Sequence, residues 1–191
     1  MSTKTQKMLH LRIELDHLNL PVWRDILIDP SANLEDLHYA IQAIFGWEDY
    51  QLHEFQKDGK RYGYIDPEGD GDEEWQNEAN IGVTDMLTKK DDSIDYIYDF
   101  ADHWHHTISL IGYSDKIPDV YVECIDGKNA CPPEDSGGVE GYEHLLNVLR
   151  SPNHFEHEEV KEWFGEGFSP NRFSIAEANT SLQESFTYED E

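Results

Sequence analysis

The chain has 191 residues, 12% of them aromatic, and its 41 acidic against 14 basic side chains give a formal net charge of −27. This length is typical of one domain, and the charge argues against duplex DNA as a partner and for a basic protein or a cation, because DNA-binding proteins need a basic stripe to displace counterions. Two cysteines make no disulfide framework, and no signal-like start or long apolar run is present, so we expect a soluble, cytoplasmic protein without membrane contact.

A predicted β-hairpin opens the folded part, after a flexible N-terminus at residues 1–7. Apolar residues at alternate positions from Leu9 to Leu15 predict a half-buried strand that starts at Met8. Residues 22–29 show the same alternation and predict the partner strand.

The clearest helix is predicted over residues 33–45. Ser31 or Asn33 is placed to cap its N-terminus, its apolar residues recur at helical spacing, and Gly46 ends it. His38 falls on the apolar face, where a histidine is either a hydrogen-bonded core residue or a ligand.

The remaining pattern completes an α+β chain. Strands are expected within 50–66, with a turn at Asp58–Gly59, and at 93–100, 106–113 and 119–127; residues 66–80 are expected to form an acidic loop, 82–92 a short helix, and 138–149, 157–165 and 174–183 three further helices. Because strands come first and helices last, we expect a mixed or antiparallel sheet roll with the long helix packed on one face and short C-terminal helices. The single domain is expected at 8–184 and an acidic tail at 185–191.

The stretch "YDFADHWHH", at residues 98–106, concentrates acids, histidines and aromatic residues. We expect a corner between two strands, with Tyr98, Phe100 and Trp104 buried and with His103 and His105 toward solvent.

His106 has the strand parity of the apolar residues that follow it, so it is expected to point inward. In a hairpin, Asp99 or Asp102 would fall within hydrogen-bond distance of this ring. A carboxylate that orients a histidine occurs in metal sites and also in purely structural networks, and both interpretations stay open.

A second stretch, "CPPEDSGGVEGYEHLL", carries two acids just before the helix predicted from Gly138. Glu134 and Asp135 either stabilise the start of this helix, where negative charge is favourable, or face His106 and complete a pocket.

The candidate pocket therefore has seven members: Asp99, Asp102, His106, Glu134, Asp135, His38 and His53. If a divalent metal binds, its expected ligands are His106, Asp99, Asp102 and Glu134. The simpler expectation is that no cofactor is needed.

Four ordered stretches resemble the plasmid pRiA4b ORF-3-like family. They are "PVWRDILID", "LEDLHYAIQAIFGWEDYQLHEF", "YIYDFADHWHHTISL" and "CPPEDSGGVEGYEHLL". The resemblance runs from about residue 8 to residue 182 and implies an α+β, roll-like fold without an established activity. The chain departs from the family pattern at Ala101, where glycine is usual, at His103, which is often acidic, and at Ser136, which is often cysteine.

Three functions are compatible with these observations. The first is a non-catalytic interaction module with an acidic surface. The second is a metal-assisted hydrolase built on the His/Asp/Glu pocket, so whether the protein is an enzyme is left open. The third is a nucleic-acid or recombination-related protein, which the charge disfavours, because a resolvase must grip phosphates and the chain has five arginines in all.

Overall fold

A computed structural model describes residues 7–64, 75–116 and 120–187. Residues 1–6 of the expected N-terminal segment, most of the acidic loop at 66–80, Asp119 of one expected strand and the last four residues of the tail lie outside this part of the chain. The elements, in chain order, are β1 (Met8–Leu15), β2 (Val22–Ile28), α1 (Leu34–Phe45), β3 (His53–Lys57), β4 (Lys60–Gly63), β5 (Trp75–Asn77), the 3₁₀ turn η1 (Glu78–Asn80), α2 (Val83–Met86), β6 (Ser93–Tyr98), β7 (Trp104–Ser114), β8 (Val122–Lys128), α3 (Gly138–Leu149), α4 (His157–Phe164) and α5 (Ile175–Thr187).

The strands form one eight-stranded sheet in the order β5-β4-β3-β6-β7-β1-β2-β8. All neighbouring pairs are antiparallel except β4 and β5, so the sheet is mixed. The predicted hairpin of β1 and β2 is confirmed, with Leu11 opposite Ile26. The α+β class predicted from the order of the elements is therefore confirmed.

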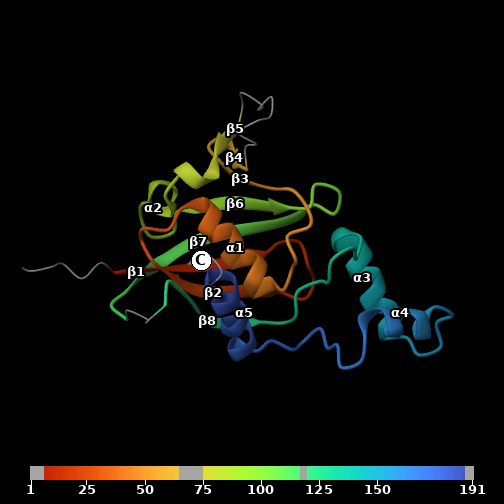
Figure 1. Ribbon diagram of the computed structural model, residues 1–191. Helices are drawn as coiled ribbons and strands as arrows, with labels where there is room; N and C mark the ends of the chain where they lie inside the picture. Colours follow the sequence, from red (N-terminus) through yellow and green to blue (C-terminus); the bar gives the residue numbers. More distant parts are fainter. Residues whose placement is uncertain (1–6, 65–74, 117–119, 188–191) are drawn as a thin grey trace, which may run out of the picture.

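Helix α1 covers one face of the sheet, and α5 packs beside it and against β8 (Figure 1). Asn33 is the N-cap of α1 and forms a capping box with Asp36, whereas Ser31 bonds to Asp29 instead. Gly46 ends the helix at a φ of 78°, a left-handed conformation that glycine adopts without strain.

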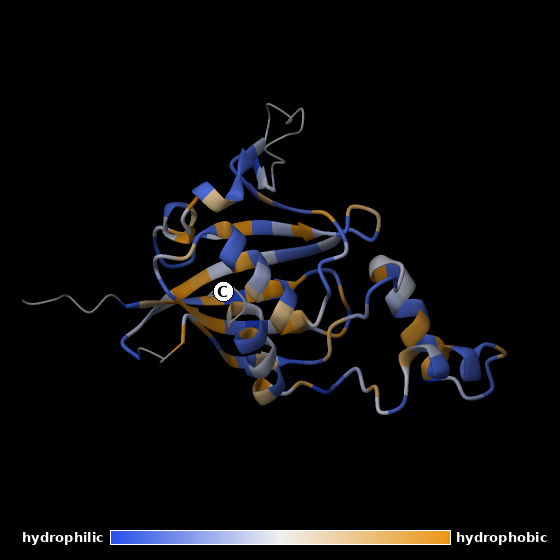
Figure 2. Cartoon of the chain, in the orientation of Figure 1, coloured by the Kyte–Doolittle hydropathy of each residue, from blue (hydrophilic) through white to orange (hydrophobic). Residues whose placement is uncertain are grey.

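The hydrophobic core lies between α1 and the sheet. Apolar side chains of β1, β2 and β7 are fully buried there, and Figure 2 shows these apolar residues concentrated on the strands beneath the helix. The alternation from Leu9 to Leu15 is confirmed, because Leu9, Leu11, Ile13 and Leu15 are all buried.

The charged side chain of Arg24 is buried where α1 ends against β2. It donates hydrogen bonds to the carbonyl oxygens of Ile44, Trp23 and Lys128 at 3.1, 2.8 and 2.9 Å, and its guanidinium lies 3.9 Å from the ring centre of Phe173. Burial lowers the pKa of this arginine. The carbonyl at the negative end of α1 and the aromatic face thus take the place of a carboxylate partner.

Two of the segments expected to be loop or tail differ from the structure. Residues 75–80 are not solvated loop but form β5 and η1, because Trp75 lies under the Arg61 guanidinium, at 4.4 Å, and Glu78 is buried against a histidine. At the other end, α5 continues to Thr187, three residues into the segment expected to be tail.

The C-terminal helices occupy two separate places. Helices α3 and α4 pack against each other and lie apart from the layer formed by α1 and α5 (Figure 1). In α5, Asn179 donates to the carbonyl of Cys124 and accepts from its backbone N–H, both at 2.8 Å, so that one side chain bonds twice to the backbone of β8. Among the described residues, no helix is both long and apolar enough to span a membrane.

The corner at residues 98–106 is mainly architectural, but one of its aromatic residues was placed wrongly. Tyr98 and Trp104 are buried as expected, whereas Phe100 is 42% exposed. Phe100 lies outside because the turn begins at Asp99, whose φ of 57° redirects the chain before Phe100 reaches the core.

We predict that Trp104→Ala lowers the free energy of unfolding by about 3–5 kcal/mol, because it empties a large, fully buried site. Phe100→Ala removes a comparable ring from the same corner and should lower stability by less than about half as much. Denaturant titration of both variants measures the difference. Equal losses would show that the corner does not depend on the indole.

Candidate functional site

The two aspartates of the corner bond to backbone amides rather than to His106. Asp99 Oδ1 accepts from the N–H groups of Ala101 and Asp102 at 2.9 and 3.1 Å, which closes the turn. Asp102 Oδ2 accepts from the N–H of Gly137 at 3.0 Å. Both carboxylates are therefore committed to holding loops in place.

His106 is fully buried and belongs to the core. Its Nδ1–H donates to the carbonyl of Trp104 at 3.0 Å, and its Nε2 has no hydrogen-bond partner within the described part of the chain. The rings of Phe45 and Trp47 lie nearly perpendicular to it, with ring centres 5.0 and 5.3 Å away. Burial lowers the pKa of His106 to about 3, so the ring is neutral at physiological pH.

Glu134 faces Tyr98 instead of His106. It accepts from the Tyr98 hydroxyl at 2.9 Å and from the N–H of Glu48 at 3.0 Å. The expected metal-ligand set of His106, Asp99, Asp102 and Glu134 is therefore not assembled, because each of the three carboxylates is bound to another donor. Asp135 lies further along the same loop, at the groove between α3 and α4.

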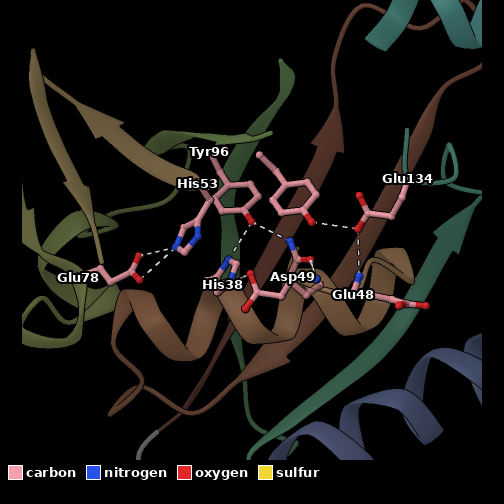
Figure 3. Close-up of polar contacts among 9 residues, drawn as sticks. His38, Glu48, Asp49, His53, Glu78, Tyr96 and Glu134 are labelled. Carbon is pink, nitrogen blue, oxygen red and sulfur yellow. Dashed lines mark hydrogen bonds and ion pairs between the residues drawn. The ribbon is translucent and has the colours of Figure 1, made fainter. Parts of the chain in front are cut away.

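The structure does bring His38 and His53 together. His38 projects from the buried face of α1 and His53 from the start of β3, and their rings stack with centres 3.5 Å apart and planes 5° from parallel. Each ring also meets an acidic residue: Asp49 in the loop after α1 and Glu78 in η1 (Figure 3). We call His38, Asp49, His53 and Glu78 the histidine cluster.

A ring of directed hydrogen bonds fixes the tautomer of His38. The Asp49 N–H can only donate, so the amide oxygen of Gln42 faces it, at 3.1 Å, and the amide nitrogen of Gln42 donates to the Tyr96 hydroxyl at 3.1 Å. The Tyr96 hydroxyl then donates its own proton to His38 Nδ1 at 2.9 Å. In the neutral ring the proton of His38 therefore sits on Nε2 and is donated to Asp49 Oδ1, 3.0 Å away.

His53 is oriented from the opposite side. Its Nε2 lies 2.8 and 3.1 Å from the two carboxylate oxygens of Glu78, so Nε2 carries the proton in this contact. The Glu78 and His53 side chains are 3% and 9% exposed. The neutral ring thus keeps its lone pair on Nδ1.

Burial keeps His38 uncharged. It lowers the pKa of the ring, the hydrogen bond to Asp49 opposes this shift, and the nearby His53 lowers the pKa further. Two stacked imidazoles this close repel each other strongly when both are charged, and His38 offers a neutral nitrogen beside a carboxylate.

Sequence reasoning found the two histidines but missed their acidic partners, Asp49 and Glu78. Both lie in segments that look like acidic turn and loop. The only signal was that His38 and Gln42, one helical turn apart, place two polar groups on an otherwise apolar face.

A second feature, the α3–α4 groove, has a volume of about 370 Å³. Its walls combine apolar and acidic side chains, and Trp163 is 45% exposed on one of them. The lining residues are Asp135, Ser136, Gly137, Gly141, His144, Leu145, Glu156, Glu159, Val160 and Trp163.

Comparison with known proteins places the chain among uncharacterised relatives. The model of a family described as "Plasmid pRiA4b ORF-3-like protein" matches residues 7–177. An uncharacterised protein of Sinorhizobium fredii, y4hQ, is 32% identical over 162 residues, which are 83% of this chain and 81% of that protein. The crystal structure of a protein of unknown function from Methanosarcina mazei, MM3350, shares 34% identity and superposes with a TM-score of 0.79, covering 89% of this chain and 96% of that one.

We predict that His106 makes the fold sensitive to acid. Its pKa falls from about 6.5 in the unfolded chain to about 3 in the folded one, so the unfolded state binds the proton first as the pH drops. The contribution of His106 to the free energy of unfolding is on the order of a few kcal/mol. It is fully present above pH 6.5 and is lost progressively between about pH 6.5 and 3.

The measurement is the free energy of unfolding against pH for the wild type and for His106→Phe, which has no titrating ring at this position. The variant should show a flatter dependence in this range, whatever its absolute stability. Identical slopes would contradict the assignment.

Proposed function

We propose a function for this chain, which belongs to the plasmid pRiA4b ORF-3-like family. It acts as a non-catalytic interaction module that binds a basic segment of a partner protein in the α3–α4 groove. The named relatives are themselves of uncharacterised or unknown function, so no activity is transferred from them. The proposal rests on the groove.

The observation that carries it is an exposed tryptophan between apolar and acidic neighbours. Trp163 lines the groove together with the apolar Val160 and Leu145, and Glu156 and Glu159 of the same helical segment line it too. Tryptophan is enriched among the residues that dominate binding energy at protein interfaces. A partner with one large apolar side chain flanked by lysines or arginines matches this surface in shape and in charge.

The overall charge favours the same class of partner. With 41 acidic against 14 basic side chains, the protein attracts basic chains over distances of several ångströms and speeds their association. The same charge repels nucleic-acid phosphates, which supports a protein partner over the nucleic-acid alternative. The hydrolase alternative has less support, because the residues expected as its ligands form hydrogen bonds with other groups.

We predict that a labelled peptide of alternating lysine and leucine binds the protein and that Trp163→Ala weakens this binding by about 30-fold, the effect of losing a central interface residue. Glu156→Lys together with Glu159→Lys should weaken it by at least about tenfold through repulsion. Fluorescence anisotropy measures both dissociation constants.

The matched control is Glu158→Lys with Glu162→Lys, which makes the same charge change on the opposite face of α4. It should leave most of the affinity in place, and a peptide of alternating glutamate and leucine should not bind. Equal loss in both double variants would show that net charge alone attracts the peptide, and the groove would then not be its site.

A further inference from the structure

We propose that His38, Asp49 and His53 form a binding site for one transition-metal dication of the zinc type, oriented by Glu78 and Tyr96. This site is independent of the α3–α4 groove. Within the described residues these three are the one group of histidine, cysteine or acidic side chains whose candidate ligand atoms all lie within 4.8 Å of one another.

The distances suit a single ion after a small movement. Zinc binds imidazole nitrogen and carboxylate oxygen at about 2.0–2.2 Å, so two ligands on one ion lie about 3–4 Å apart. A spacing of up to 4.8 Å therefore requires the ligands to close by about an ångström. Asp49 can supply this movement, because its side chain is 41% exposed in the loop after α1.

The donor set selects the class of ion. Two imidazole nitrogens and one carboxylate oxygen suit zinc, cobalt or nickel, whereas calcium and magnesium prefer sites built from oxygen alone. Three protein ligands would leave a fourth coordination position for a water molecule.

Both histidines already have the outer partners that metal-binding histidines usually have. Glu78 holds His53 through Nε2, which leaves Nδ1 for the ion. Tyr96 holds His38 through Nδ1, which leaves Nε2 on the side of Asp49. Such partners fix the ring orientation and usually affect metal affinity about 10- to 100-fold when they are removed.

The stacked geometry imposes one condition on binding. The lone pair of an imidazole nitrogen lies in the ring plane, and two planes 5° from parallel with centres 3.5 Å apart cannot both contain the same ion. One ring must tilt. His53 is the ring that can do so, since Glu78 holds it through Nε2, whereas His38 is held at both nitrogens and is only 2% exposed.

Binding also requires the proton of His38 to change places. Without the ion, this proton sits on Nε2 and faces Asp49. An ion on Nε2 moves it to Nδ1, and the Tyr96 hydroxyl then turns from donor to acceptor. The tautomer of His38 is therefore a spectroscopic signature of metal at this site, one that non-specific binding to surface acids would not produce.

The test uses the full chain, stripped with a chelator and titrated calorimetrically with zinc at high ionic strength, so that weak binding to surface acids is screened. We expect one zinc per chain, without competition from calcium. His53→Gln and Asp49→Asn should each weaken binding more than tenfold, and Glu78→Gln should weaken it about 10- to 100-fold. Nitrogen-15 spectra of the histidines should show the His38 proton moving from Nε2 to Nδ1.

His105→Gln is the matched control. His105 also contacts carboxylates, with Nδ1 2.7 Å from Asp16 and Nε2 3.5 Å from Asp95, but it lies on a half-exposed part of the sheet away from the histidine cluster. This variant should bind zinc like the wild type. Circular dichroism of each variant verifies that it is folded. Any of three results would overturn the proposal: the wild type binds no zinc, His53→Gln binds zinc as tightly as the wild type, or His105→Gln is the variant that loses zinc binding.

Discussion

The packing of α1 on the sheet is the constraint on which the rest of the structure depends. The helix buries its apolar stripe against the sheet, where its inner-face side chains share one core with residues of β1, β6 and β7. Two of these side chains, His38 and Gln42, are polar, so the sheet has to offer them partners. Tyr96 does so with one hydroxyl group, and the loop after the helix completes the hydrogen bonds through Asp49.

Much of the fold could be predicted from the sequence because its signals are local. The alternation in β1, the spacing and glycine stop of α1 and the turn at Asp58–Gly59 each depend on residues a few positions apart. The parallel pairing of β5 with β4 could not be predicted, since it depends on Trp75 meeting Arg61 across a long segment rich in acids. Composition suggested a solvated loop there, whereas Trp75 packs against Arg61 and Glu78 pairs with His53.

The candidate site was predicted less well, because sequence gives side-chain parity but not the partner of a buried polar atom. His106 was correctly placed inside, but the reason for its position is its aromatic surroundings and not a carboxylate. Asp99 or Asp102 was expected beside it; instead Asp99 closes its own turn and Asp102 accepts from the N–H of Gly137. The two conspicuous stretches do meet, through the hydrogen bonds Tyr98–Glu134 and Gly137–Asp102. Gly138, at a φ of 68°, also lies so close to the Asp102 carbonyl that an added Cβ would be 2.5 Å from that oxygen. The two stretches are thus neighbours, but the candidate metal ligands lie in the histidine cluster.

The double hydrogen bond between Asn179 and Cys124 has a consequence for how copies of the protein meet. Strand β8 ends the sheet, and the outer side of such a strand is a template on which another chain can add by backbone pairing. Asn179 occupies a donor and an acceptor of that template with one amide, in the way a neighbouring strand would, and α5 blocks the approach. The C-terminal helix therefore protects the protein from edge-to-edge aggregation as well as covering its core.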